Sequence, residues 1–418
     1  MFEKHRSGEI DLSLLKDENY GALLPLIQDV NITDINWNGI QLWIDDVTRG
    51  RYMSDIVLTD EFVESFVIRI SNIANRTFNK YNPKLEAETE ELRITIVHSS
   101  VSNTGTCISI RKTPAVKRIE FEKSINSGNY CSREIADFIS NCIKSKLNVV
   151  ICGLPGVGKT ELVKYLTNYI QPRDRVITIE DTLELHYSKI NVGYDCLEFK
   201  VNDKTFTYID AIKESLRLLP QWILLSEARS VEVKHLLESL STGAKCITTI
   251  HTDDVRKVPD RIKNMIGAVS DTAIEDTVYD FLDVAILVDK DIMYDDETGA
   301  DKITRYISQV AVYTRENNKN ECVVLVDEGK RIDAVIPKTV LRKFNQAGAK
   351  DPFQYFKQDW GNQMDAVMAY RAKLSQPVAP TIGETEADYK YEEPVDDSYK
   401  YAPDDTGDVT SEGVEDNE

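Results

Sequence analysis

The chain has 418 residues, of which 42% are hydrophobic, and a formal net charge of −20, a composition that suits a globular protein with room for two domains. No apolar stretch approaches the roughly 20 residues of a transmembrane helix, and the N-terminus lacks the apolar core of a signal peptide, so we expect a cytoplasmic protein. The seven scattered cysteines form no Cys-x-x-Cys pair, which argues against a disulfide framework or a zinc site.

The first part of the chain is expected to form a small domain. We assign residues 1–25 to an N-terminal extension and residues 26–120 to an α+β, PAS-like domain. Two short apolar runs flank Asn38-Gly39, a dipeptide that favours a hairpin turn. Apolar periodicity predicts a helix over 61–73 and strands over 92–98 and 107–111.

A helix over 121–145 is expected to link this domain to a second one over 146–374, where short apolar runs alternate with amphipathic segments. Such alternation predicts a parallel sheet flanked by helices, and functional side chains should gather at the carboxyl ends of its strands. The expected strands cover 148–153, 175–180, 222–227 and 245–252, and the expected helices cover 159–170, 207–219 and 231–240.

The first of those strands is followed by GLPGVGKT, which fits the phosphate-loop pattern G-x-x-x-x-G-K-[ST] in full. The glycines let the loop curl so that its N–H groups point at phosphate oxygens. Lys159 supplies a positive charge toward the terminal phosphates, and the Thr160 hydroxyl can ligate Mg²⁺. The residues expected to contact ATP are Gly153, Pro155, Gly156, Val157, Gly158, Lys159, Thr160 and Glu161.

Acidic residues follow the next two strands of the predicted sheet. Glu180 and Asp181 stand where a strand meets a loop, so they are candidates to reach Mg²⁺ or its waters, together with Thr160. Glu227 ends the strand WILLSE and could orient or deprotonate an attacking water. Arg229 could reach developing negative charge or stabilise its own loop.

A histidine follows the last predicted strand. His251 lies in TTIHTDD, where a ring nitrogen could sense the terminal phosphate by a hydrogen bond. By itself this residue could equally be a structural histidine.

These pieces, in this order, resemble the secretion-system traffic ATPases: the type II and type IV secretion motors and the Tad-pilus assembly ATPases of the CpaF type. The resemblance runs from about residue 25 to 330 and includes SEAR, the stretch TG…TTIHT and the element ISIRK. It implies a RecA-like P-loop domain, continued after residue 255 by helices and strands and by a helical segment over 338–373. It also implies that Arg111 of ISIRK is lent toward the nucleotide.

The resemblance implies a homohexameric ring with MgATP at the domain junctions. Such a ring would power secretion, conjugation or pilus assembly through inner-membrane platform proteins, which would hold it at the cytoplasmic face of the membrane. Three positions depart from the family pattern: Gln221 stands for an Asp, Ser226 for a Gly and Ala244 for a His. The last departure puts the complete histidine box in doubt.

Two alternatives stay open at this point. One is a nucleic-acid motor on the same core, and the other is a nucleotide-binding scaffold that hydrolyses little, as Ala244 suggests. The segment 375–418 is expected to be disordered, and it carries most of the chain's net negative charge, with 14 acidic and 2 basic residues from 376 onward. This acidic balance counts against direct binding of nucleic acid.

Overall fold

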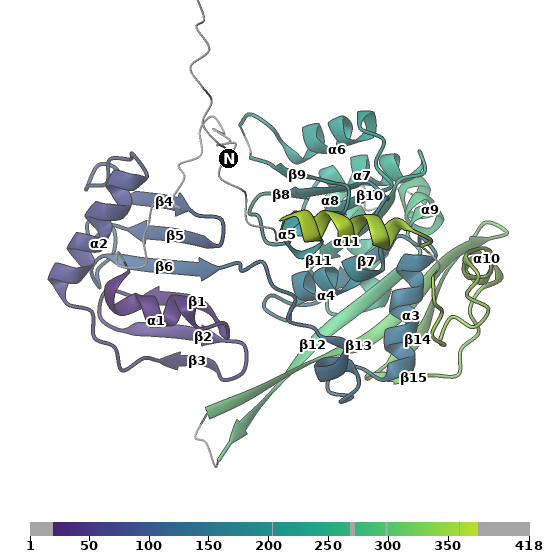
Figure 1. The fold of residues 1–418 in the computed structure, drawn as a ribbon, viewed down its shortest axis with the longest axis horizontal. Helices are drawn as coiled ribbons and strands as arrows, with labels where there is room; N and C mark the ends of the chain where they lie inside the picture. Colours follow the sequence, from purple (N-terminus) through teal and green to yellow (C-terminus); the bar gives the residue numbers. More distant parts are fainter. Residues whose placement is uncertain (1–19, 203, 268–271, 297–299, 359, 375–418) are drawn as a thin grey trace, which may run out of the picture. The chain divides into compact units, whose positions relative to one another are not determined.

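Two β-sheets organise the chain in the computed structural model, which describes residues 20–202, 204–267, 272–296, 300–358 and 360–374 (Figure 1). The predictions for the first 19 residues and for the acidic tail lie outside the described residues. None of the helices in the described ranges combines the length and the apolar character that a membrane-spanning segment requires.

The N-terminal sheet has six antiparallel strands in the order β3-β2-β1-β6-β5-β4. Alternate residues of each strand share one face, and on that face Ile35, Ile44 and Ile110 are almost completely buried. Phe66 of helix α2 packs into the same core. The elements are a 3₁₀ turn Gly21–Leu23, α1 Leu24–Gln28, β1 Ile32–Trp37, β2 Leu42–Asp46, β3 Gly50–Met53, α2 Asp60–Ile73, β4 Lys84–Glu88, β5 Leu92–Val97 and β6 Cys107–Lys112.

The hairpin expected around Asn38-Gly39 is confirmed, since β1 and β2 pair antiparallel on either side of it. Gly39 has a φ of +96°, a conformation that favours glycine. A side chain there would also meet the carbonyl oxygen of Thr104 at 2.2 Å. The turn therefore needs glycine both for its backbone conformation and for the close approach of the neighbouring loop.

The second sheet has nine strands in the order β15-β14-β13-β12-β7-β11-β10-β8-β9. The strands from β12 to β9 are parallel, and β13, β14 and β15 extend the sheet antiparallel. All four residues of β7 are buried, as is typical of a sheet covered on both faces. The strands are β7 Val149–Cys152, β8 Val176–Glu180, β9 Cys196–Lys200, β10 Trp222–Leu225, β11 Lys245–Ile250, β12 Val284–Asp295, β13 Ala300–Glu316, β14 Lys319–Asp327 and β15 Lys330–Arg331.

Helices cover both faces of this sheet. One core contains side chains of α3 Arg133–Lys144, α4 Lys159–Leu166 and α10 Lys338–Ala347. The opposite core contains side chains of α6 Tyr208–Arg217, α7 Glu232–Leu240, α8 Val258–Ile266 and α9 Thr272–Phe281. The remaining elements are a π-helical turn Phe121–Ile125, 3₁₀ turns Thr167–Tyr169 and Val255–Lys257, α5 Tyr187–Ile190 and α11 Gln363–Leu374.

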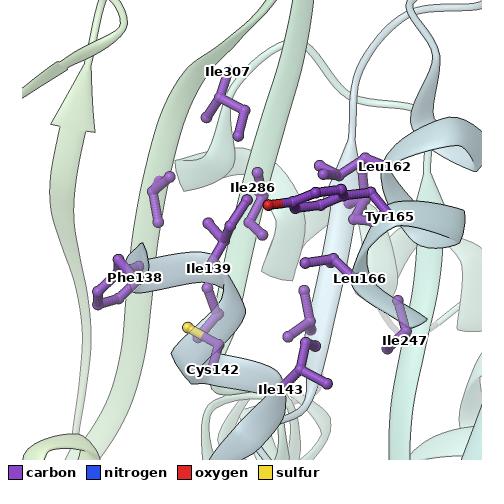
Figure 2. Packing of buried hydrophobic residues seen from close by; sticks show 14 of the residues in the cluster. Phe138, Ile139, Cys142, Ile143, Leu162, Tyr165, Leu166, Ile247, Ile286 and Ile307 are labelled. Atoms are coloured by element: carbon purple, nitrogen blue, oxygen red, sulfur yellow. The ribbon is translucent and has the colours of Figure 1, made fainter. Parts of the chain in front are cut away.

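The helix expected over 121–145 corresponds to the π-helical turn and α3. Figure 2 shows α3 and α4 side by side over the strands, and its labelled side chains are Phe138, Ile139, Cys142, Ile143, Leu162, Tyr165, Leu166, Ile247, Ile286 and Ile307. Because α3 is packed into this core, its position depends on the second sheet, and its role as a linker stays a prediction.

The expected fold class, a mixed α/β domain with a parallel sheet preceded by a smaller α+β domain, is confirmed. Sequence alternation did not predict the length of the β12–β13 ribbon, in which Val284 pairs with Val312 at one end and Asp295 with Ala300 at the other. Aromatic rings pack together in one core of the second sheet. The centroid of the Phe138 ring lies 4.6 Å from that of Phe353 and 5.6 Å from that of Phe344.

We expect Phe138→Ala to lower the free energy of unfolding by about 3–5 kcal/mol, because it removes a fully buried ring and leaves a cavity between α3, α10 and Phe353. Tyr81→Ala is the control, since that ring is 79% exposed and its loss should change stability by about 0.5 kcal/mol or less. Urea denaturation of the three proteins measures both values. Equal losses for the two variants would contradict this account of the core.

Candidate functional site

The phosphate loop connects β7 to α4. Gly153, Gly156 and Gly158 all have positive φ, at +147°, +75° and +96°. A side chain on Gly153 would lie 2.4 Å from the carbonyl oxygen of Val288, so β12 holds the start of the loop tightly. The predicted loop residues therefore form one continuous turn that leads into a helix N-terminus, an arrangement suited to binding phosphate.

Lys159 is the buried cation of this loop, with a residue exposure of 9%. Its Nζ donates hydrogen bonds to the carbonyl oxygens of Gly153 at 2.9 Å and Leu154 at 3.2 Å, and it lies 3.2 Å from Nδ1 of His251. Burial lowers the pKa of Lys159, and the negative charge of Glu227 opposes this shift. The ammonium group is thus poorly solvated where phosphate would bind, which strengthens its attraction to an anion.

Glu227 follows β10 and meets two cationic or ionisable groups. One carboxylate oxygen lies 2.8 Å from Nε2 of His251, and the other lies 2.8 Å from Nη2 of Arg229. Arg229 also donates from Nη1 to Asp181 at 2.8 Å. The structure therefore brings together Lys159, His251, Glu227, Arg229 and Asp181 in one chain of polar contacts.

The parallel register explains this assembly. β10 lies between β8 and β11, with Leu225 opposite Ile179 and Thr248. Glu227 and Asp181 follow the ends of β10 and β8, while His251 follows β11 directly. Because parallel strands end at the same edge of a sheet, residues about 25 to 45 positions apart in sequence become neighbours.

Arg229 is held between two carboxylates. Burial by itself would lower its pKa, but the hydrogen bond from Arg229 to Glu227 and the charge of Asp181 raise the pKa overall. The guanidinium group therefore stays charged, and in this conformation it forms ion pairs with both acids.

The carboxylate that contacts Thr160 is Glu184, a residue that the sequence analysis did not select. The Thr160 hydroxyl donates to Oε2 of Glu184 at 3.2 Å. The signal was available, since Glu184 lies in the same acidic stretch as Glu180 and Asp181. A hydroxyl and a carboxylate are oxygen ligands of the type that Mg²⁺ prefers, so this pair, next to a phosphate loop, fits a magnesium ion held together with nucleotide.

Glu180 is completely buried, and it holds its own loop. Oε1 accepts hydrogen bonds from the N–H groups of Glu184 and Leu185, both at 3.2 Å, while Oε2 is buried and has no partner in the structure. Burial raises the pKa of Glu180 to about 8, although the two backbone hydrogen bonds act in the opposite direction. Asp181 is paired with Arg229 instead, so the metal role of both residues stays a proposal.

Glu161 and Arg111 complete the set of predicted site residues. Glu161, in the first turn of α4, accepts from Arg118 Nη1 at 3.0 Å. Arg111 lies on β6 of the N-terminal sheet, where its Nε donates to Asp34 at 2.9 Å. That hydrogen bond raises the pKa of Arg111, and the charge of Glu184 contributes in the same direction. Within one chain, then, Arg111 is bound to its own sheet.

Two of the three residues that depart from the family pattern, Gln221 and Ala244, lie at the opposite end of the strands from Glu227 and His251. Gln221, just before β10, accepts from the backbone N–H of Arg175 at 2.7 Å. Ala244 precedes β11 whereas His251 follows it, so the six-residue strand separates them by roughly 20 Å. Only Ser226 lies at the carboxyl edge, where its hydroxyl is 3.3 Å from the Tyr208 hydroxyl.

The chain is similar in sequence to several known proteins. Residues 70–319 match the family model described as Type II/IV secretion system protein. A putative conjugal transfer protein of Mycobacterium tuberculosis is 24% identical over 354 residues, covering 79% of this chain and 96% of the relative. The protein VirB11 of Agrobacterium fabrum is 35% identical over 126 residues, which cover 29% of this chain and 36% of VirB11.

Among solved structures, the ATPase DotB of Legionella pneumophila superposes with a TM-score of 0.52 at 15% sequence identity. The superposition covers 89% of each chain. At this identity the likeness bears on the fold alone, and it supports the two-domain α/β architecture described above.

We expect the stability of the protein relative to Glu180→Gln to fall as pH rises from about 4.5 to 8, since the folded-state pKa of about 8 exceeds the ordinary value of 4.5. The contribution of the neutral carboxyl is fully present below pH 4.5 and is lost as pH rises through 8, with a slope of at most about 1.4 kcal/mol per pH unit. Urea denaturation at pH 5 to 9 measures the difference.

Glu64→Gln, on an exposed position of α2, is the matched control for the loss of one carboxylate. A pH-independent difference for Glu180→Gln would mean that Glu180 is ionised in the folded protein at neutral pH.

Proposed function

The chain belongs to the Type II/IV secretion system protein family, and we propose from that premise that it is an ATPase that powers a secretion, conjugation or pilus-assembly machine. The observation that carries the proposal is the chain of contacts from Lys159 through His251 to Glu227. These contacts connect the lysine of the phosphate loop to a carboxylate at the carboxyl edge of the sheet, where the terminal phosphate of ATP would lie.

Glu227 is the proposed general base. Its carboxylate would accept a proton from the water that attacks the terminal phosphorus of ATP, once the contact with His251 or Arg229 has opened. Lys159 would then turn from the carbonyl oxygens of Gly153 and Leu154 toward the phosphate oxygens and stabilise their growing negative charge. His251 contacts both residues. Its position would therefore change when Lys159 turns toward a bound terminal phosphate.

The magnesium ion is expected at the Thr160 hydroxyl, with Glu184 and the acids Glu180 and Asp181 as further candidates to bind the ion or its waters. When bound, Mg²⁺ supplies positive charge that neutralises phosphate oxygens. Arg229 already neutralises Asp181 in this conformation, so binding of the metal near Asp181 would compete with that ion pair.

We further propose a homohexamer in which Arg111 of one subunit acts on the nucleotide of its neighbour. The supporting observation is that the Arg111 side chain is 58% exposed on the N-terminal sheet, where Asp34 is its one ion-pair partner among the described residues. Platform proteins at the cytoplasmic face of the inner membrane are the proposed partners. The machine could be a conjugation system, as the name of the mycobacterial relative suggests.

The scaffold alternative loses its main support. It rested on Ala244, and Ala244 lies at the opposite end of β11 from His251. A nucleic-acid motor is disfavoured by the net charge of −20.

Glu227→Gln should reduce the rate of ATP hydrolysis by about 10²–10⁴-fold, because the amide cannot accept the proton of the attacking water. Binding of a fluorescent ATP analogue should persist. Glu238→Gln, an exposed position on α7, serves as the matched control and should retain full activity. The assignment of Glu227 as the base would be abandoned if its variant hydrolysed ATP at the parent rate.

Mixing two inactive variants tests the hexamer. We expect Arg111→Ala to lose about 10³-fold in hydrolysis and to regain activity when mixed with Glu227→Gln, since some junctions then combine an intact arginine with an intact glutamate from different subunits. A mixture of Lys159→Ala with Glu227→Gln should stay inactive, because these residues serve the same nucleotide from one chain. Failure of the first mixture to recover activity would place Arg111 in its own subunit's site or outside catalysis.

A further inference from the structure

Two arginines outside the predicted site join the phosphate-loop region to the N-terminal sheet. The first is Arg305 on β13. Its Nε donates to the carbonyl oxygen of Gly156 at 3.4 Å, and its Nη1 donates to the carbonyl oxygen of Val47 at 2.7 Å. One guanidinium group therefore bridges the tip of the phosphate loop and the turn between β2 and β3.

The second arginine is Arg118, which follows the N-terminal sheet in the connecting segment. Its backbone N–H and Nη1 both donate to the carboxylate of Glu161, at 3.2 Å and 3.0 Å. Its Nη2 donates to the carbonyl oxygen of Val30 at 3.4 Å. Glu161 follows Thr160 directly in α4, so this bridge begins one residue from the expected magnesium ligand.

Both bridges reach the N-terminal sheet where β1 begins and β2 ends, at Val30 and Val47. The N–H of Val47 donates to the carbonyl oxygen of Asn31 at 2.9 Å, which ties the start of β1 to the end of β2. Asp46 fixes the adjoining turn, because its Oδ1 accepts from the N–H groups of Thr48 and Arg49 at 2.7 Å and 3.0 Å. A displacement of Val47 would therefore also displace Asn31, just before β1.

The bridge through Arg305 bears on the phosphate-binding groups themselves. The C=O of Gly156 and the N–H of Val157 belong to one planar peptide unit and point in opposite directions. By holding the carbonyl, Arg305 orients that N–H, which is one of the loop donors available to phosphate. A phosphate that pulls on the N–H therefore changes the bond that Arg305 makes on the other side.

The two arginines also influence each other. Burial lowers the pKa of Arg305, the charge of Arg118 lowers it further, and Glu161 acts in the opposite direction. Glu161, which forms an ion pair with Arg118, therefore also acts on Arg305 through its charge.

We propose that Arg118 and Arg305 form a clamp that transmits nucleotide occupancy of the phosphate loop to the start of β1 and the end of β2 in the N-terminal sheet. The proposal rests on the nucleotide binding proposed above and adds the residues through which the first domain responds to it. Both arginines are positioning residues, since they act through the Gly156 carbonyl and Glu161. Their loss should leave Glu227 and its contacts in place.

The test combines nucleotide titration with amide hydrogen exchange on the full chain. A fluorescent ADP, titrated with Mg²⁺, gives the affinity. Exchange of the Val47, Thr48 and Arg49 amides is then followed with and without saturating MgADP. In the parent protein, nucleotide should slow this exchange by about tenfold, the factor expected for one charge-assisted hydrogen bond.

In Arg305→Met the affinity should fall by about tenfold or less, and at saturation the exchange of these amides should no longer respond to nucleotide. Arg305→Lys should behave in the same way, because it keeps the charge but cannot bridge two carbonyl groups. It also supplies a charge-retaining variant in case Arg305→Met does not fold. Arg118→Met should weaken the response, and the double variant should abolish it. Lys302→Met, exposed on the same strand, is the control and should respond as the parent does.

A full response in the double variant or in Arg305→Lys would overturn the clamp while leaving the proposed function intact. If the parent protein did not bind the fluorescent ADP at all, the proposed function would fail, and the clamp with it. The titration thus separates the two failures before the exchange data are compared.

Discussion

The contact between His251 and Glu227 is the interaction on which the candidate site depends. A carboxylate beside a buried lysine in a poorly solvated loop would be attracted to that lysine and could block the phosphate position. The imidazole stands between them, with Nδ1 near Lys159 and Nε2 near Glu227. The ring therefore separates the ammonium group of Lys159 from the carboxylate of Glu227.

That arrangement requires the carboxyl ends of β10 and β11 to be held together. Hydrogen bonds between residues next to Glu227 and His251 hold them. Thr249, on β11, donates from its hydroxyl to the carbonyl oxygen of Ser226 at 2.6 Å, and the N–H of Ala228 donates to the carbonyl oxygen of Thr249 at 2.8 Å. The loop that carries Glu227 is thereby fastened to the strand that carries His251. Glu227 and His251 are therefore positioned by β10 and β11, whereas the phosphate loop is positioned by β7 and β12.

The acidic loop after β8 follows a different principle. It is shaped from within by Glu180, whose carboxyl group sits in the core and receives the N–H groups of the two residues at the far end of the loop. Burying a carboxyl group is costly unless it is neutral or fully hydrogen-bonded. A protonated Glu180 meets this condition, while Glu184 accepts a hydrogen bond from the Thr160 hydroxyl, so the two acids of this loop have different surroundings.

The sequence by itself determined the phosphate loop, the order of the strands and helices around it, and the positions of Lys159, Thr160, Glu227 and His251, because local spacing and strand-end placement are encoded within short segments. Only the tertiary structure decided which acid faces Thr160 and which is buried. It also decided that Ala244 lies far from His251, and that Arg118 and Arg305 reach the loop. These outcomes depend on strand register and on contacts between residues up to 258 positions apart in the chain, such as Arg305 and Val47, and no pattern within a segment carries that information.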